Sequence, residues 1–142
     1  MSTSIRSIVE DRVTGYLAAN TTGISIHKGV TDQIRVIPAI IAHAASAVKP
    51  ASLGANNFGN YRITLKVYVY SSADDGSLED HRERVSLVHG LLTDNTGLQD
   101  FWGSSNGQLY DIWIESDEEG MSQRRYGNVI TFTMMCVLPP QV

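Results

Sequence analysis

Five charged side chains of opposite sign gather in one short segment, SDEEGMSQRRYG at residues 116–127. They are Asp117, Glu118, Glu119, Arg124 and Arg125. Three kinds of chemistry would use such a segment: an active-site rim, a hook for nucleic acid, or an arm that grips a neighbouring subunit. No nucleophile or paired base accompanies these charges, which argues against an active-site rim. Phosphate groups repel the acids of this segment, which argues against a nucleic-acid hook.

We interpret the segment as a loop between two strands that is held at its base and projects as an assembly arm. Its acids would face the arginines of an adjacent subunit, because complementary charges set the register between partners more than they add affinity. A two-stranded arm alone is only marginally stable in water, which favours a partner that completes it. The alternative is a solvated hairpin tip, whose mixed charges keep a strand edge from pairing with other chains.

Residues suited to catalysis or metal binding are sparse. The sequence has no GxSxG elbow, P-loop, HExxH or CxxC motif. Its four histidines are His27, His43, His81 and His89. The last two lie eight residues apart on a predicted helix, so they are two turns from each other and cannot chelate one metal ion alone. We expect all four to be exposed or at the edge of the core.

Two further candidates have ordinary structural explanations. Asp74 and Asp75 precede a predicted helix, where acids and serines form turns and caps, so they do not predict a cation site. Cys136 is the one cysteine, and it lies in an apolar strand where a thiol acts as a small buried hydrophobe. The sequence therefore predicts no catalytic residue, no metal site and no cofactor, and it predicts a protein that is not an enzyme.

The composition limits the class of protein. At 142 residues, of which 42% are hydrophobic, the chain is expected to form a single domain over residues 1–142 with its own core. The formal net charge is −4 and no basic cluster exceeds two residues, which argues against a dedicated DNA-binding protein. The first residues lack the apolar core of a secretory signal, and no apolar run approaches the roughly 20 residues that span a membrane. We expect a soluble protein made in a cytoplasm.

The elements that must position the charged segment can be followed along the chain. Apolar residues at three- and four-residue steps predict a helix over residues 5–17, and a short strand follows at 24–27. The apolar segment 34–44 predicts a strand that lies at a sheet edge or has Pro38 near its start. Small residues, Gly and Asn predict a long loop over 46–60, which we expect to become ordered on assembly.

The segment YRITLKVYVY, residues 61–70, is the clearest strand. Its strict alternation places one set of side chains on the core and the other set against solvent or a partner. Four side chains of the second set are predicted to lie at an interface between subunits, because Tyr and Arg are favoured at interfaces. They are Arg62, Lys66, Tyr68 and Tyr70.

The remaining elements complete the predicted fold. Ser77 caps a second helix, with Asp80 at the capping-box position, and strands at 109–116 and 128–139 flank the charged segment as an antiparallel pair. These elements predict an α+β fold. It consists of a mainly antiparallel sheet of about four strands with two helices packed on one face, a long loop and a charged β-hairpin.

Three segments of the chain resemble the tail terminator, or tail completion, proteins of tailed bacteriophages. They are PAIIAHA at 38–44, GNYRITLKVYVYSSADDGSLEDHRERV at 59–85 and RRYGNVITFTMMCVLP at 124–139. The resemblance rests on the order of elements and on short patterns, and it covers residues 35–138. Neck and head–tail joining proteins share this layout.

This resemblance implies a structural role. Proteins of this family form a ring, usually of six subunits, that caps the tail tube, stops its growth and joins it to the connector of the head. The implied partners are further copies of the chain, the tail tube protein and a connector or neck protein, with no membrane, and DNA passes through the ring without specific binding.

The implied location is the tail or neck of the virion, after assembly in the host cytoplasm, and the predicted interface residues would contact a subunit or the tube. Two other functions stay open: a small soluble enzyme of unknown reaction, and a bacterial adaptor or binding module on a similar scaffold.

Overall fold

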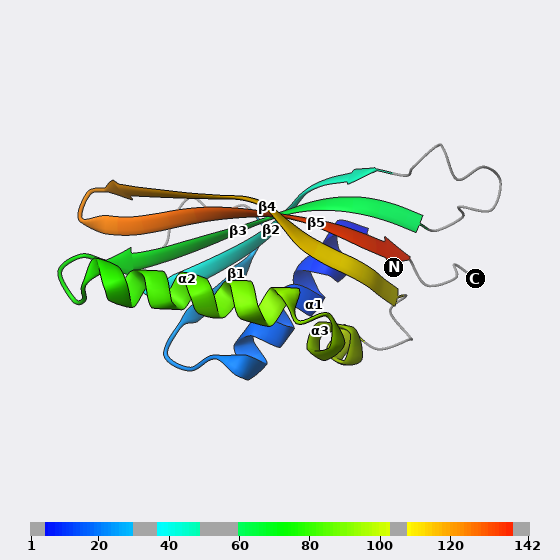
Figure 1. Cartoon of the computed structure of the whole chain (residues 1–142), viewed down its shortest axis with the longest axis horizontal. Helices are drawn as coiled ribbons and strands as arrows, with labels where there is room; N and C mark the ends of the chain where they lie inside the picture. Colours follow the sequence, from blue (N-terminus) through cyan, green and yellow to red (C-terminus); the bar gives the residue numbers. More distant parts are fainter. Residues whose placement is uncertain (1–4, 30–36, 49–59, 103–107, 138–142) are drawn as a thin grey trace.

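The computed structural model describes residues 5–29, 37–48, 60–102 and 108–137 (Figure 1). These ranges contain three helices and five strands. In chain order they are α1 (Ile5–Asn20), β1 (Ser25–Lys28), β2 (Ala39–Val48), β3 (Asn60–Ser72), α2 (Leu78–Thr93), α3 (Asn95–Trp102), β4 (Gln108–Ser122) and β5 (Arg125–Val137). None of the helices in these ranges is long and apolar enough to cross a membrane.

The described strands form one sheet in the order β1-β2-β3-β5-β4. Neighbours from β2 to β4 are antiparallel, whereas β1 runs parallel to β2. The fold is α+β, as predicted. The sheet differs from the prediction because it is mixed and has five strands rather than about four. The additional strand is the short segment predicted near residues 24–27, which bonds to the first residues of β2.

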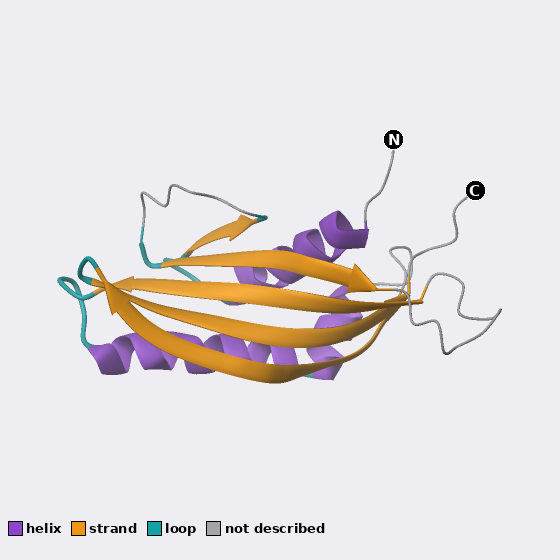
Figure 2. Cartoon of the chain, turned by 90° about the horizontal axis from the view of Figure 1, so that it is seen from above, coloured by secondary structure: helices purple, strands orange, loops and turns teal. Residues whose placement is uncertain are grey.

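Helices cover one face of the sheet and leave the other open. Figure 2 looks onto the open face, and the helices lie behind the strands. The structure has a third helix beyond the predicted two, α3, which begins at Asn95 directly after α2. α1 packs on β1 and β2, whereas α2 packs beneath β3, β5 and β4.

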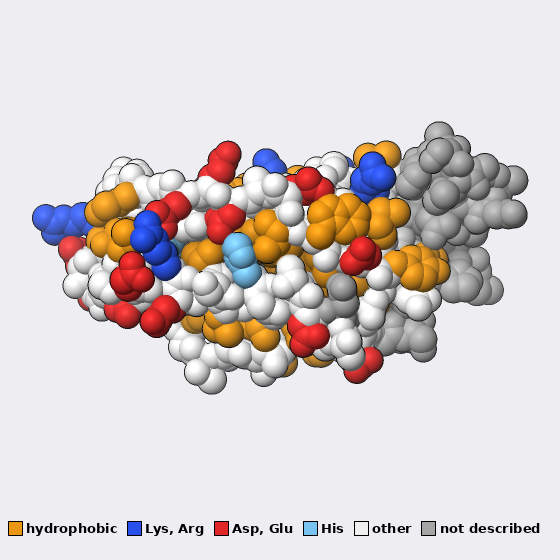
Figure 3. All heavy atoms as spheres, in the orientation of Figure 1, with side chains coloured by type: hydrophobic (Ala, Val, Ile, Leu, Met, Phe, Trp, Pro, Cys, Tyr) orange, Lys and Arg blue, Asp and Glu red, His pale blue; other side chains and the backbone are white. Residues whose placement is uncertain are grey.

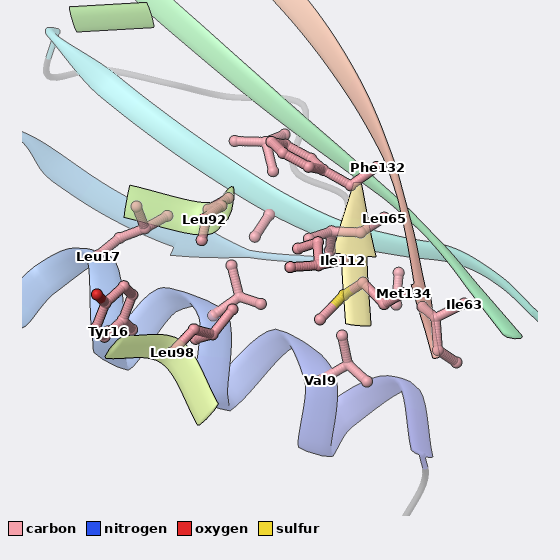
Figure 4. Packing of buried hydrophobic residues seen from close by; sticks show 14 of the residues in the cluster. Val9, Tyr16, Leu17, Ile63, Leu65, Leu92, Leu98, Ile112, Phe132 and Met134 are labelled. Atoms are coloured by element: carbon pink, nitrogen blue, oxygen red, sulfur yellow. The ribbon is translucent and has the colours of Figure 1, made fainter. Parts of the chain in front are cut away.

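The core lies between the helices and the covered face (Figure 4). On β3 the predicted alternation is confirmed, because Ile63, Leu65, Val67 and Val69 are fully buried. Helix side chains fill the opposite side of the same cluster. They include Val9 and Leu17 of α1, Leu92 of α2 and Leu98 of α3.

The N-terminus of α2 forms as the sequence predicts. The Ser77 hydroxyl accepts a hydrogen bond from the Asp80 amide at 3.2 Å, and the Asp80 carboxylate accepts one from the Ser77 amide at 3.1 Å. This reciprocal capping box satisfies two amides that the first turn of a helix leaves without partners.

The predicted strand and loop around β2 are corrected at their boundary. β2 begins at Ala39, directly after the cis Ile37–Pro38 peptide bond, so Pro38 lies just before the strand rather than inside it, close to the predicted position near its start. The strand continues to Val48 and β3 begins at Asn60, so both ends of the predicted loop over 46–60 are strand. Residues 49–59, on which the prediction of a loop that orders on assembly mainly rests, lie outside the described residues.

The predicted charged loop is mostly strand. β4 and β5 are joined by a turn of only two residues, Gln123 and Arg124, whose φ angles are 52° and 61°. Positive φ at both central residues is the geometry of a type I′ turn, whose twist matches that of the flanking strands. The two strands of the hairpin therefore stay paired, as part of the sheet, up to this turn.

The three acids of the segment belong to β4, which corrects the prediction that they project from a loop. Asp117 and Glu119 pair in register with Ile130 and Asn128, both of which are buried, so these two acids lie on the face that α2 covers. Glu118 lies between them and faces the open side, because successive side chains of a strand alternate.

Candidate functional site

A chain of buried polar side chains joins α2 to the hairpin. His81 of α2 is completely buried, and its neighbours Ser71 and Asn128 are 2% and 5% exposed. The His81 Nδ1 atom lies 2.8 Å from Ser71 Oγ, and its Nε2 atom lies 2.6 Å from Asn128 Oδ1. This burial contradicts the expectation that every histidine is exposed or at the core edge.

The chain of hydrogen bonds assigns a role to each atom. Asn128 Oδ1 is an acceptor, so His81 Nε2 carries the proton and donates it. The guanidinium of Arg84 donates to Ser71 Oγ at 3.0 Å, which leaves the Ser71 hydroxyl free to donate to His81 Nδ1. Each polar atom of His81 therefore has a partner, as buried polar groups require.

The network reaches the surface at Asp117 of β4. Asn128 Nδ2 donates to Asp117 Oδ1 at 2.6 Å, and His89 of α2 lies 2.9 Å from Asp117 Oδ2 through its Nε2 atom. Two histidines two turns apart on α2 thus bind the hairpin at two points. They bind through Asn128 and Asp117 and do not meet each other at a metal ion.

A second contact lies beside the first at the solvent-exposed edge. Arg82 of α2 donates two hydrogen bonds of 2.9 Å to the carboxylate of Glu119 on β4. The hydrogen bond from Arg82 holds the pKa of Glu119 below its usual range. Because water screens an exposed pair of this kind, it orients α2 against the hairpin more than it stabilises the fold.

These contacts change the interpretation of the predicted arm. Asp117 and Glu119 bind α2 of their own chain, so they are already engaged when the subunit is alone. Arg124 lies at the hairpin turn, where its guanidinium is 3.6 Å from Asp74 and largely exposed. Arg125 faces the open side beside Tyr70. Burial raises the pKa of Tyr70, and the charge of Arg125 opposes part of that rise. The five charges therefore do not form one projecting group.

The Ser71–His81 contact has the connectivity of a nucleophile and its base. Both residues are buried, and Arg84 also donates to the same hydroxyl. In this arrangement the hydroxyl does not reach solvent, and the contacts position α2 against the sheet. Cys136 is buried as predicted, and burial raises the pKa of its thiol to about 12. Within the described ranges, no group of three His, Cys, Asp or Glu side chains is placed to hold a metal ion.

The open face of the sheet carries the four side chains predicted from the alternation of residues 61–70. Tyr68 and Tyr70 stack there, with ring centroids 6.4 Å apart and planes 6° from parallel. In the described part of the chain, neither Arg62 nor Lys66 makes an ion pair or a side-chain hydrogen bond. An aromatic pair flanked by unpaired cations is more than an ordinary solvated surface needs.

The rows across this face follow from the strand register. Lys66 pairs with Thr131 of β5, which pairs with Ser116 of β4. One row nearer the hairpin turn, Val129 lies between Tyr68 of β3 and Glu118 of β4. The centre of the face is therefore uncharged, with bases on β3 and an acid on β4.

A shallow groove of about 520 Å³ opens at the hairpin end of this face. Two glycines that pair across the hairpin, Gly120 and Gly127, leave its floor without side chains. The ring of Tyr70 lies over Gly127, because a Cβ placed there would be 3.3 Å from the ring. Glu118 and the exposed Met121 form parts of its wall.

Sequence reasoning missed the buried network. His81 occupies the same stripe as Val85, Val88 and Leu92, at a spacing of four residues before Val85, so its position on the buried face was readable. Its partners Ser71 and Asn128 lie on two other elements, and no local pattern indicated that these three side chains would meet.

No protein-family model matches the chain, and no curated protein matches its sequence. Chains from solved structures do match its fold, 32 in number. One of them comes from the virion of a native gene transfer agent particle, with a TM-score of 0.62 and 10% sequence identity. The match covers 93% of this chain and 95% of that chain, so the two share their fold over almost their whole lengths.

Proposed function

We propose that this chain is a structural protein of a phage-like virion rather than an enzyme. The fold likeness carries the proposal, because the matched chain belongs to the virion of a gene transfer agent particle and is covered to 95% of its length. The resemblance of the sequence to tail terminator proteins points to the same class of particle.

The finer role that we propose is a ring of six copies that ends the tail tube and joins it to the connector between head and tail. The partners are then the tail tube protein, a connector or neck protein and further copies of this chain. DNA passes through the lumen without specific binding. The net charge of −4 is compatible with this, since a net acidic chain has little attraction for phosphate.

The open face of the sheet supports an assembly role. It carries the stacked Tyr68 and Tyr70 rings and the cations Arg62 and Lys66, and no described helix covers it. Tyr and Arg are enriched at protein interfaces, whereas a surface that meets only water does not need stacked rings. The hairpin contributes Glu118 and Arg124 at one end of the same molecule.

The observation that favours an enzyme instead is the contact between Ser71 and His81. Both side chains are buried and hydrogen-bonded within the fold, so a substrate would need α2 to move before it could reach the hydroxyl. We therefore rank catalysis below assembly.

The mass of the purified chain in solution discriminates these functions. We expect native mass measurements over a rising concentration series to show a species of six times 15.6 kDa. Its mass should not increase further at higher concentration, because a ring closes on itself. A chain that stays monomeric at every concentration and binds a small molecule would support the enzyme alternative and contradict the ring.

A further inference from the structure

The two edges of the sheet differ in how they are closed. At the β1 side, β1 pairs with β2 only as far as Ala42. Beyond that point the Glu10 carboxylate of α1 accepts a hydrogen bond of 2.9 Å from the Ala44 amide of β2. Lys28 of β1 also pairs with Asp11 of α1. At this side α1 thus contacts the two outermost described strands. At the other side β4 is the outermost described strand.

The outer strand is strongly acidic. β4 carries five acids and no Lys or Arg, and Figure 3 shows acidic side chains along this side of the molecule. Two copies that met through β4 alone would place these acids opposite each other, which is destabilising. A contact that uses β4 must therefore bring it to a different surface of the second copy.

Three charges of the open face remain without a partner inside the described parts of the subunit. They are Arg62, Lys66 and Glu118. The cations stand on β3 and the acid stands on β4, and the β5 residues in the same rows, Met135, Thr131 and Val129, are uncharged. Neighbouring strands lie about 4.8 Å apart, so Lys66 and Glu118, which stand in adjacent rows, are separated by roughly two such spacings across the strands, whereas Arg62 lies two rows farther along β3. The face therefore has a basic half and an acidic margin.

We infer that a second copy of this chain covers the open face, arranged so that Glu118 of one copy meets Arg62 and Lys66 of the next. This inference rests on the proposed ring and adds the surfaces and the direction of its contact. A ring needs two different patches that fit each other, since a contact between identical patches stops at a dimer. The acidic margin and the basic half are two such patches on one molecule.

The surroundings of the charges fit this contact. The groove beside Glu118 has a floor of two glycines, so a neighbour's side chain can approach the backbone of the hairpin there. Tyr68 and Tyr70 border the same region and supply aromatic area at small conformational cost. Paired charges then select the orientation of the two copies, and the aromatic area provides most of the attraction.

The experiment uses two variants with reversed charge. In Glu118→Lys the three positions 62, 66 and 118 are all positive, and in Arg62→Glu with Lys66→Glu they are all negative. We expect each variant alone to associate at least about tenfold more weakly than the natural chain, because like charges meet at every contact. An equimolar mixture should recover association, since the copies can alternate around the ring with opposite charges at each contact.

Glu83→Lys is the matched control. Glu83 is exposed on α2, and its substitution changes the net charge of the chain by the same amount as Glu118→Lys. It should leave association unchanged, and circular dichroism should show that every variant is folded. Recovery in the mixture supports the inference. Rings of normal mass from either variant alone, or weak association in the mixture, would overturn it while leaving the proposed ring intact. A natural chain that never associates would overturn both.

Discussion

Replacing His81 with leucine should lower the free energy of unfolding by about 3 kcal/mol, since it leaves Asn128 and Ser71 without their buried partner. Leucine fills a similar space, so the loss should come from the unpaired polar atoms more than from a cavity. Urea unfolding followed by circular dichroism measures the change.

The matched control for this substitution is His27→Leu, because His27 is exposed on β1. Its effect should stay within about 0.5 kcal/mol, as is usual for surface positions. If His81→Leu proved as neutral as the control, the buried hydrogen bonds would not be what fixes α2 to the hairpin.

Replacing Tyr68 and Tyr70 together with serine should weaken association of the copies by about a hundredfold and leave the subunit folded. Both rings lie on the open face, and removing two aromatic side chains from the centre of an interface commonly costs about 2 to 4 kcal/mol. Sedimentation over a concentration series, together with a urea unfolding curve for the isolated subunit, separates assembly from stability.

Leu87→Ser serves as the control for this pair, because Leu87 is a 42% exposed hydrophobic residue on α2, on the covered side of the sheet. It should not alter association. Normal rings from the double tyrosine variant would show that the open face is not an interface.

Local patterns in the sequence predicted the parts of the fold that local physics determines. The capping box at Ser77 formed because the two residues that bond each other are three positions apart. The alternation of residues 61–70 determined the two faces of β3, since a strand that buries one face cannot slip by one residue. Four of the predicted interface residues therefore lie together on the open face.

The charged segment was misread because its composition resembles a loop while its structure depends on distant partners. Asp117 and Glu119 are tolerated in a strand because α2 supplies Arg82 and His89. Those residues lie far from the acids in the sequence, so no local rule indicates the contact. Glycine at 120 and 127 also suggests a turn, yet these residues face each other across the ladder, and the true turn lies at Gln123 and Arg124.

The sequence pattern also failed to indicate the pairing of β1 and the bulges of β4. β1 has only four residues, which is too few for an alternation pattern to identify its partner or its parallel direction. On β4 the register shifts between Leu109 and Asp111 and again between Ile114 and Ser116. A bulge adds a residue to one strand and moves later side chains to the other face, so simple alternation fails there.

The position of the chain in assembled particles tests the central claim most directly. Particles can be assembled in a host that carries the chain joined to a small tag. Electron microscopy with a tag-specific label then locates the chain in these particles. The proposed function predicts label in a ring at the head-proximal end of the tail tube, six copies in each particle. Particles that carry no label, with the tagged chain left entirely in the soluble fraction, would contradict a structural role in the virion.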